Sequence, residues 1–238
     1  YSIFSVLKNE FGFDLSSTKY FAGHSLGEYS ALVCSESLKF NDALFLLYER
    51  GKCMQEAVPI GRGTMIAVLG SKIDEIKDFI NSVNVQGVCE IANDNAEGQI
   101  ILSGDLEKMN NLKDILKENK KKFIPLNVSA PFHCSLMKPA ALKMKDKINL
   151  VKFQKPNFDI VSNVTSVPER NPEEIKKLLI DQICSTVRWR ESIINMSQEN
   201  VTNFVEIGPG KVLSSMVKRT VKNKKTIKTN SIDDMKKT

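Results

Sequence analysis

Residues 21 to 30 read Phe-Ala-Gly-His-Ser-Leu-Gly-Glu-Tyr-Ser, with a serine two positions from a glycine on either side. A G-x-S-x-G segment can form a sharp turn between a strand and a helix, and its glycines remove the Cβ atoms that would clash where the two meet. Such a turn exposes the hydroxyl of Ser25 at the amino end of a helix, where backbone N–H groups favour developing negative charge. We interpret this stretch as a nucleophile elbow suited to acyl transfer.

The same pentapeptide also occurs in tight turns whose serine only caps a helix. Two flanking features favour the elbow here. Tyr20 to Ala22 can form the end of a strand, and Glu28 to Glu36 contains helix formers with apolar residues spaced to pack inward. We therefore expect a sheet around this strand and chemical partners for Ser25 elsewhere in the chain.

The composition is that of an ordinary globular protein, with 42% hydrophobic and 26% charged residues among 238. We expect a soluble protein that does not enter a membrane, because no apolar run approaches the ~20 residues that span a bilayer. The five cysteines are scattered and odd in number, which argues against a disulfide framework and against a zinc site. We expect a reducing compartment and no bound metal.

The net charge of +6 comes mostly from lysines spread along the chain. One denser run, between residues 218 and 228, fits either a solvated surface or a docking patch for an acidic partner. No aromatic residue interrupts this run and no nucleic-acid-binding motif is present, so we expect no nucleic-acid partner.

Strand and helix patterns alternate on both sides of a central stretch, which predicts an α/β fold with a doubly wound, mostly parallel sheet. The expected strands are the elbow strand, residues 158–162 and residues 204–207. A sheet centred on an elbow strand normally has strands before it, so we expect that an N-terminal strand segment ahead of Tyr1 is missing from this sequence.

The central stretch has a different order of predicted strands and helices. Between residues 61 and 126 the pattern predicts strand, helix, strand, strand, helix and strand, which is the order of a ferredoxin-like α+β unit. This divides the chain into a large α/β catalytic subdomain, residues 1–60 and 127–238, and a small inserted subdomain, residues 61–126. Asn93 and Asn95 fall at a strand-to-strand loop of the insert, where turn formation and substrate contact are both open roles.

Arg50 lies on the apolar side of an expected helix at residues 42–56, together with Ala43, Leu46 and Met54. A guanidinium among apolar neighbours needs a carboxylate, and its planar fork suits a bidentate pair. The residues alone leave two partners open, an acid of the protein or an acidic ligand.

A serine nucleophile needs a base, and the chain contains two histidines. His24 directly precedes Ser25, and consecutive side chains of an extended segment point to opposite sides, so His24 is poorly placed as the base. His133 remains as the candidate, although a histidine in a loop can also have a structural role.

Six motifs occur in order along the chain: GHSLGEYSAL at 23–32, RGKCMQ at 50–55, NDNAEGQ at 93–99, SAPFH at 129–133, LMKPA at 136–140 and EIGPGKVL at 206–213. Together they resemble the malonyl-CoA:acyl-carrier-protein transacylases of type II fatty-acid synthesis, which are related to the acyltransferase domains of polyketide and fatty-acid synthases. The resemblance runs nearly end to end, and it implies an α/β-hydrolase-like core.

The resemblance implies a role for each matching residue. Ser25 would carry the malonyl group as an ester, His133 would be the base, and Arg50 would hold the free carboxylate of the malonyl group. The backbone N–H of Leu26 would be one oxyanion donor, and the backbone carbonyl at Gln182 would orient the histidine. Asn93, Asn95 and Phe132 would line the substrate cleft, with Phe132 matching the malonyl-selective pattern.

The resemblance also implies substrates and partners. Malonyl-CoA would be the donor, an acidic acyl carrier protein bearing phosphopantetheine would be the acceptor, and no permanently bound cofactor would be needed. We expect a monomer, in the bacterial cytoplasm or in a plastid or mitochondrion. One departure stands out, because the family's G-Q-G-x-Q motif, which supplies the second oxyanion donor, is not found in this sequence.

Two alternatives remain open at this point. A serine esterase or thioesterase of related fold would share the elbow and the histidine, although no acidic residue between positions 26 and 132 stands out as the acid of a catalytic triad. An inactive module that docks the carrier protein would keep the fold without the chemistry.

Overall fold

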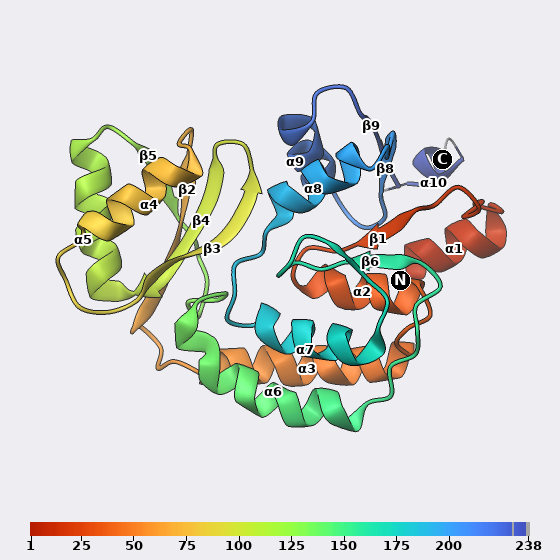
Figure 1. The fold of residues 1–238 in the computed structure, drawn as a ribbon, viewed down its shortest axis with the longest axis horizontal. Coiled ribbons are helices and arrows are strands. Elements are labelled where there is room, and N and C mark those ends of the chain that lie inside the picture. Colours follow the sequence, from red (N-terminus) through yellow and green to blue (C-terminus); the bar gives the residue numbers. More distant parts are fainter. Residues whose placement is uncertain (230, 237–238) are drawn as a thin grey trace.

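The computed structural model describes residues 1–229 and 231–236. Its helices, in chain order, are α1 (Ser2–Glu10), α2 (Leu26–Cys34), α3 (Phe40–Glu56), α4 (Ile73–Ser82), α5 (Leu106–Glu118), α6 (Lys138–Leu150), α7 (Pro172–Gln182), α8 (Trp189–Gln198), α9 (Val212–Thr220) and α10 (Ile232–Met235). Its strands are β1 (Tyr20–Ala22), β2 (Gly63–Leu69), β3 (Cys89–Ala96), β4 (Gln99–Asp105), β5 (Lys122–Pro125), β6 (Asp159–Val161), β7 (Pro168–Glu169), β8 (Asn203–Glu206) and β9 (Lys225–Lys228). The mixed α/β class predicted from the sequence is confirmed (Figure 1).

The strand β1 leads directly into the elbow. It pairs in parallel with β6, with Phe21 opposite Ile160, and β6 pairs on its other side with β7 in the antiparallel sense. Parallel neighbours end at the same edge of a sheet, so the residues that follow β1 and β6 come together. This edge carries the candidate site.

Helices α2, α3, α6 and α7 share one apolar core beneath this sheet. Tyr29 and Leu32 of α2, Leu46 of α3, Met144 of α6 and Leu179 of α7 are all fully buried in it. In Figure 1, α3, α6 and α7 lie side by side below α2. The core fixes α3 with one face toward the elbow, and Arg50 is on that face.

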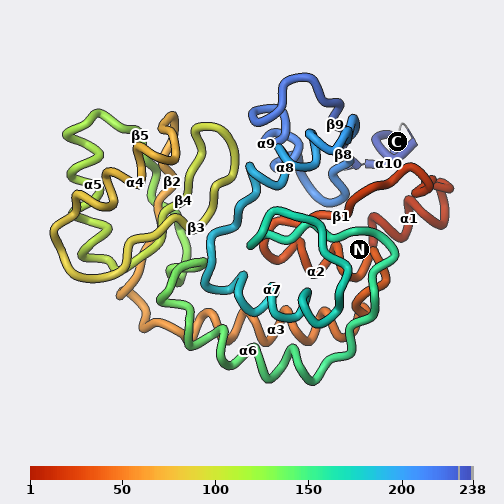
Figure 2. Tube along the Cα trace, in the orientation of Figure 1, coloured from red at the N-terminus to blue at the C-terminus, as the bar shows by residue number. Residues whose placement is uncertain are grey.

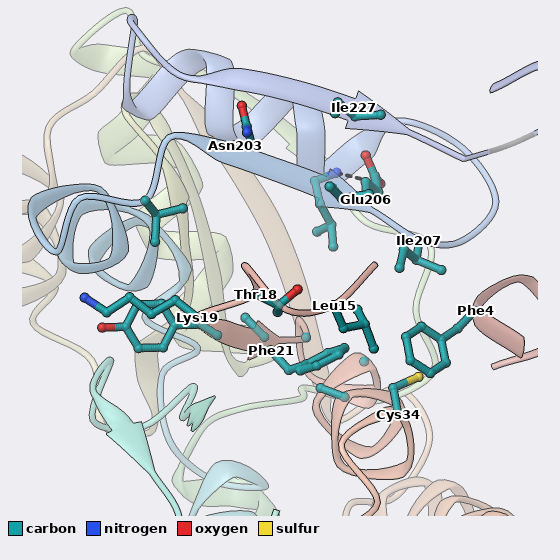
Figure 3. A pocket seen from close by; sticks show the side chains of 18 of the residues that line it. Phe4, Leu15, Thr18, Lys19, Phe21, Cys34, Asn203, Glu206, Ile207 and Ile227 are labelled. Atoms are coloured by element: carbon teal, nitrogen blue, oxygen red, sulfur yellow. Dashed lines mark hydrogen bonds between the residues drawn. The ribbon is translucent and has the colours of Figure 1, made fainter. Parts of the chain in front are cut away.

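The continuous doubly wound sheet expected from the sequence is not present among the described residues. The strands β8 and β9 pair in parallel, with Val205 opposite Ile227, as a sheet of their own. A groove of about 1080 Å³ lies between β1 and β8, and residues of α1, α2 and α9 complete its walls. Figure 3 shows Leu15 and Phe21 on one side of this groove and Glu206 and Ile227 on the other. The two parallel pairs remain separate because no described strand fills the space between their edges.

The small unit contains its six elements in the order β2-α4-β3-β4-α5-β5. Its strands form an antiparallel sheet with the spatial order β3-β4-β2-β5. Helices α4 and α5 cover one face, where Ile76 and Leu112 are fully buried against Ile66 and Leu102. Figure 2 shows the chain entering this unit after α3 and leaving it before α6.

The other side of the small unit meets the rest of the molecule along β3. This strand has register shifts between Ile91 and Asn93 and between Asp94 and Ala96. At the first shift it forms a parallel bridge to Val187, with the Asp94 N–H donating to the Val187 carbonyl over 3.0 Å. The bulged strand buries three consecutive polar residues, Asn93, Asp94 and Asn95, between the two units.

Candidate active site

Ser25 sits at the tip of the turn between β1 and α2, with a positive φ of 52°. This left-handed region is unfavourable for a residue with a side chain, so the turn stores strain at the candidate nucleophile. The expected steric need for glycine is present at Gly23, where a Cβ would lie 1.9 Å from the carbonyl oxygen of Gly27. The expectation was wrong for Gly27 itself, since a Cβ there would meet nothing within 4 Å. The close contact is therefore Gly23 against the backbone of α2.

Asn163 holds the elbow from the neighbouring strand. The Ser25 N–H donates to Asn163 Oδ1 over 2.7 Å, and Asn163 Nδ2 donates to the Gly23 carbonyl over 2.8 Å. Asn163 follows β6 by two positions and is 1% exposed. The sequence reasoning missed this residue, and the available signal was its place just after a strand parallel to the elbow strand.

His133 forms a hydrogen bond with the candidate nucleophile, with 2.8 Å between its Nε2 and Ser25 Oγ. On the other side of the ring, Nδ1 lies 2.8 Å from the backbone carbonyl of Gln182. A carbonyl can only accept, so Nδ1 carries the proton and Nε2 is left to accept from the serine hydroxyl. Burial, together with the charge of Arg50, lowers the pKa of His133 to about 3. The imidazole is therefore neutral at pH 7, as a general base must be.

Arg50 is 7% exposed and reaches the same hydroxyl from α3. Its Nη2 donates to Ser25 Oγ over 2.9 Å and to Gln182 Oε1 over 3.0 Å. Its Nε is buried and has no hydrogen-bond partner among the described residues. No acid of the described chain forms an ion pair with Arg50 within 4.0 Å. The guanidinium thus keeps an unused donor beside the nucleophile.

Gln182, the last residue of α7, connects the members of the site. Its side-chain Nε2 donates to the Ser25 carbonyl over 3.0 Å and to Glu28 Oε2 over 2.7 Å. Glu28 is 3% exposed, and burial raises its pKa to about 7 although the Gln182 hydrogen bond opposes the shift. Sequence reasoning gave Glu28 no role, although it stands three residues after Ser25 on the inner face of α2.

The other residues predicted from the sequence, Asn93, Asn95 and Phe132, lie around the hydrogen-bond network of Ser25. Asn95 reaches it through His24, with 2.7 Å between Asn95 Oδ1 and His24 Nε2. The His24 ring meets Trp189 edge to face at 5.5 Å. Asn93 is buried beside Val187, and Phe132 packs against the apolar cores on both sides of the site. No direct contact of Asn93 or Phe132 with Ser25 is recorded among the described residues.

Leu26 is the first residue of α2 and is 53% exposed. Its backbone N–H belongs to the first turn of the helix, where amides have no partner within the helix. The arrangement therefore places a neutral imidazole and a buried guanidinium against the Ser25 hydroxyl, and the amide of Leu26 follows that serine directly in the chain. This set of groups can carry out acyl transfer through a covalent ester.

The description of the family model that matches residues 11–237 reads "acyl transferase domain". The chain belongs to this family. Malonyl CoA-acyl carrier protein transacylase of Bacillus subtilis (strain 168) is 44% identical to it over 208 residues, which cover 87% of the chain and 66% of that relative. The enzyme of the same name from Haemophilus influenzae is 39% identical over 212 residues, covering 89% of the chain and 68% of the relative. The resemblance noted from the motifs is thus confirmed.

Solved structures agree with this membership. The malonyl CoA-acyl carrier protein transacylase of Coxiella burnetii has a TM-score of 0.94 at 32% identity, covering 98% of the chain and 73% of that structure. A type II polyketide malonyl-transacylase, solved in complex with its acyl-carrier protein, has a TM-score of 0.94 at 36% identity. The match covers 98% of the chain described here and 75% of the chain in that structure. The chain spans about two thirds of the length of its curated relatives.

Three further observations concern cofactors and membranes. Within residues 1–229 and 231–236, no three His, Cys, Asp or Glu side chains are grouped so that they could hold a metal ion. The five cysteines are free thiols. None of the helices in those same ranges combines the length and the apolar character needed to cross a bilayer.

Proposed function

We propose that this chain carries the transfer centre of a malonyl-CoA:acyl-carrier-protein transacylase of type II fatty-acid synthesis. One observation supports this function above the others: the buried Arg50 guanidinium binds Ser25 Oγ, lacks an acid partner among the described residues and keeps Nε unused. A cation in that position suits an acyl group with its own carboxylate, and a planar fork suits bidentate pairing. The names of the relatives support the same donor and acceptor.

In the first half-reaction, Ser25 Oγ attacks the thioester carbonyl of malonyl-CoA while its proton passes to His133 Nε2. The Leu26 N–H stabilises the oxyanion, an effect of about 3 kcal/mol for one such donor. The carbon–sulfur bond then breaks, and the sulfur leaves as coenzyme A thiol with the proton from His133. The product is a malonyl ester on Ser25.

In the second half-reaction, the phosphopantetheine thiol of an acidic acyl carrier protein enters. His133 takes the thiol proton, the sulfur attacks the ester carbonyl, and Ser25 Oγ leaves with that proton. The Gln182 carbonyl keeps the imidazole in the same tautomer through both steps, since it always accepts from Nδ1. No permanently bound cofactor takes part.

Selectivity in this proposal comes from Arg50. A substrate without a carboxylate leaves a buried cation unpaired, which costs about 3–5 kcal/mol. Asn93, Asn95 and Phe132 contribute the wall of the acyl cleft, and the His24–Asn95 hydrogen bond supports this role for Asn95.

We also propose that a parallel strand from a segment upstream of Tyr1 fills the groove between β1 and β8. The groove is lined by the open edges of two strands, and the solved relatives are longer than this chain. A strand parallel to β1 ends at the same edge as the elbow, so the residue after it can present the second oxyanion N–H to the Ser25 site. Such a strand would join the two parallel pairs into the doubly wound sheet expected from the sequence.

The division into subdomains is part of this proposal. Residues 61–126 would form the ferredoxin-like unit, supported by their element order and separate core, and residues 1–60 and 127–238 would form the α/β-hydrolase-like catalytic unit. The acyl site would lie between them. A monomer in a bacterial cytoplasm or an organelle remains our prediction for the assembly and location.

The test is intact-mass analysis of the full-length polypeptide after exposure to malonyl-CoA. We expect one malonyl adduct, absent in Ser25→Ala and removed on addition of the acyl carrier protein. Failure to form the adduct would contradict the function. Release of free malonate faster than transfer to the carrier would instead support a serine hydrolase.

Hydrogen exchange tests the proposed strand. We expect the groove-side amides of β1 and β8 to exchange rapidly in the 238-residue chain and slowly in the full-length polypeptide. Equal exchange in both proteins would contradict a strand in the groove.

A further inference from the structure

A chain of three side chains runs from the interior to the candidate acyl site. Glu28 Oε2 accepts from Gln182 Nε2 over 2.7 Å, and Gln182 Oε1 accepts from Arg50 Nη2 over 3.0 Å. Glu28 and Gln182 are 3% and 0% exposed, and Arg50 is 7% exposed. The Glu28 carboxyl group and the Arg50 guanidinium are thus connected through one neutral, buried amide.

The orientation of the Gln182 amide follows from its partners. Its oxygen faces a guanidinium, which can only donate, and its nitrogen faces a carboxylate and the Ser25 carbonyl, which accept. The opposite orientation would place the NH₂ against Arg50 and the oxygen against two acceptors. Glu28 and the Ser25 carbonyl together therefore hold the amide so that its oxygen remains directed at Arg50, and Glu28 accepts the shorter of the two hydrogen bonds.

Arg50 depends on this oxygen because its other anchors are few. Among the described residues, the guanidinium has two hydrogen-bond acceptors, Ser25 Oγ and Gln182 Oε1, and it lies over the Tyr29 ring at 6.0 Å. Once Ser25 carries an acyl ester, its Oγ is an ester oxygen and a poorer acceptor. Within the part of the chain that the structure describes, Gln182 Oε1 is then the remaining side-chain acceptor for Arg50.

We propose that Glu28 and the Gln182 side chain are positioning residues that aim Arg50 at the carboxylate of the acyl group. This inference rests on the proposed function and deepens it, because it assigns selectivity to residues that do not touch the acyl group. The role of the Gln182 side chain is separate from that of its backbone carbonyl, which binds His133.

The first test compares rates of adduct formation with malonyl-CoA and acetyl-CoA on the full-length polypeptide. Gln182→Met keeps the backbone carbonyl and the side-chain length but removes the three amide hydrogen bonds, to Arg50, Glu28 and the Ser25 carbonyl. The bond to Arg50 is the one that bears on selectivity, so we expect the malonyl-to-acetyl ratio to fall about tenfold, the size expected for one hydrogen bond to a charged group. Glu28→Leu should lower the ratio in the same direction. The matched control Glu28→Gln keeps an oxygen that accepts from Gln182, so its ratio should stay within about threefold of the parent.

The combined variant separates a shared route from two independent effects. If Glu28 acts on Arg50 through Gln182, Glu28→Leu with Gln182→Met should lower the ratio about as far as Gln182→Met alone. Equal losses with both acyl donors in every variant would mean a structural role and would overturn the proposal. The thermal midpoint of each variant identifies any that fail to fold.

A second measurement needs no turnover. In the parent, the hydrogen bond to Gln182 slows rotation of the Arg50 guanidinium, so we expect separate ¹⁵N resonances for its two terminal nitrogens, assigned with Arg50→Lys. These resonances should merge in Gln182→Met and in Glu28→Leu but not in Glu28→Gln. Unchanged resonances would overturn the positioning role, whereas absence of a malonyl adduct on the parent would overturn the proposed function.

Discussion

Ser25 Oγ is shared by two side chains with different roles. His133 Nε2 lies 2.8 Å away and can take its proton, and Arg50 Nη2 donates to it over 2.9 Å. The cation stabilises negative charge on the oxygen, while burial beside that cation keeps the imidazole neutral. At the scale of single residues, the candidate site therefore combines a hydroxyl that a neutral imidazole can deprotonate with a cation that can bind an acid.

Removal of Arg50 should change the choice of acyl group. In Arg50→Ala, we expect the malonyl-to-acetyl ratio of adduct rates to fall roughly 100-fold, because the carboxylate loses its buried partner. This factor corresponds to about 3 kcal/mol. Arg50→Lys keeps the charge but not the planar fork, so its malonyl-to-acetyl ratio should lie between those of the parent and Arg50→Ala. The measurement is a time course by intact mass with each acyl-CoA. A variant that loses both activities equally would show that Arg50 does not select the acyl group.

The protonation of His133 can be observed directly. Burial and the Arg50 charge lower its pKa to about 3, so the ring should remain neutral as pH falls from 8 to 5. In an NMR titration with labelled histidine, His133 should show no transition near 6.5, the ordinary midpoint. The two histidines are distinguished by His24→Gln. A His133 transition near 6.5 would contradict the buried, neutral base.

The turn between β1 and α2 is the element on which the site depends. It directs the Ser25 hydroxyl toward two residues that enter from other elements, His133 after β5 and Arg50 on α3. Asn163 holds its backbone at two points. The elbow geometry is thus set by the close backbone contact at Gly23 and by Asn163, which follows the adjacent strand β6.

The two glycines of the elbow should respond differently to alanine. Gly23→Ala places a Cβ 1.9 Å from the Gly27 carbonyl oxygen, so we expect a loss of about 1–3 kcal/mol or more in the free energy of unfolding. Gly27→Ala meets nothing within 4 Å inside a helix, so we expect no loss and a gain of up to about 1 kcal/mol. Urea unfolding followed by circular dichroism measures both. Equal destabilisation by the two substitutions would contradict the close approach at Gly23.

At the scale of the whole molecule, the candidate site depends on how the small unit is attached to the rest. Besides the two connecting segments, β3 contacts Val187 through two backbone hydrogen bonds, and the Thr186 hydroxyl donates to the Ile91 carbonyl. Asp94, 2% exposed at its side chain, also pairs with Arg190 of α8 through Nε at 2.9 and 3.0 Å and Nη2 at 2.8 Å. These contacts hold Asn95 where it meets His24.

Breaking the Asp94–Arg190 pair should loosen this attachment. Asp94→Ala leaves Arg190, whose side chain is 20% exposed, without its acid partner, and the loss of a hydrogen bond to a charged group costs about 1.5–3 kcal/mol. The joint replacement Asp94→Leu with Arg190→Met should recover most of the loss, because neither charge is left buried. Urea denaturation gives the free energies. If Asp94→Ala costs less than about 1 kcal/mol, the pair does not hold the two units together.

Much of this arrangement follows from local patterns. Periodicity and glycine spacing predicted three features that depend on residues close together in the chain. These are the strand-turn-helix at Ser25, the position of Arg50 on the buried face of its helix and the six-element order of residues 61–126. His133 was predicted as the base by elimination, because His24 is unsuitable on local geometry and the chain has one other imidazole. The separation of β8 and β9 from β1 was not predicted. Sequence periodicity indicates which segments form strands, but it does not indicate which strand edges pair with one another.

By itself, the sequence predicted the type of chemistry, from an elbow serine, a single suitable histidine and an arginine on an apolar helix face. Only the tertiary structure decided how these groups act on one another. Glu28 and Gln182 are 154 residues apart, and Ser25 and Asn163 are 138 apart, yet each pair is joined by a hydrogen bond of 2.7 Å. Burial depends on such distant packing, and it is burial that neutralises His133 and leaves Arg50 Nε without a partner in the described chain.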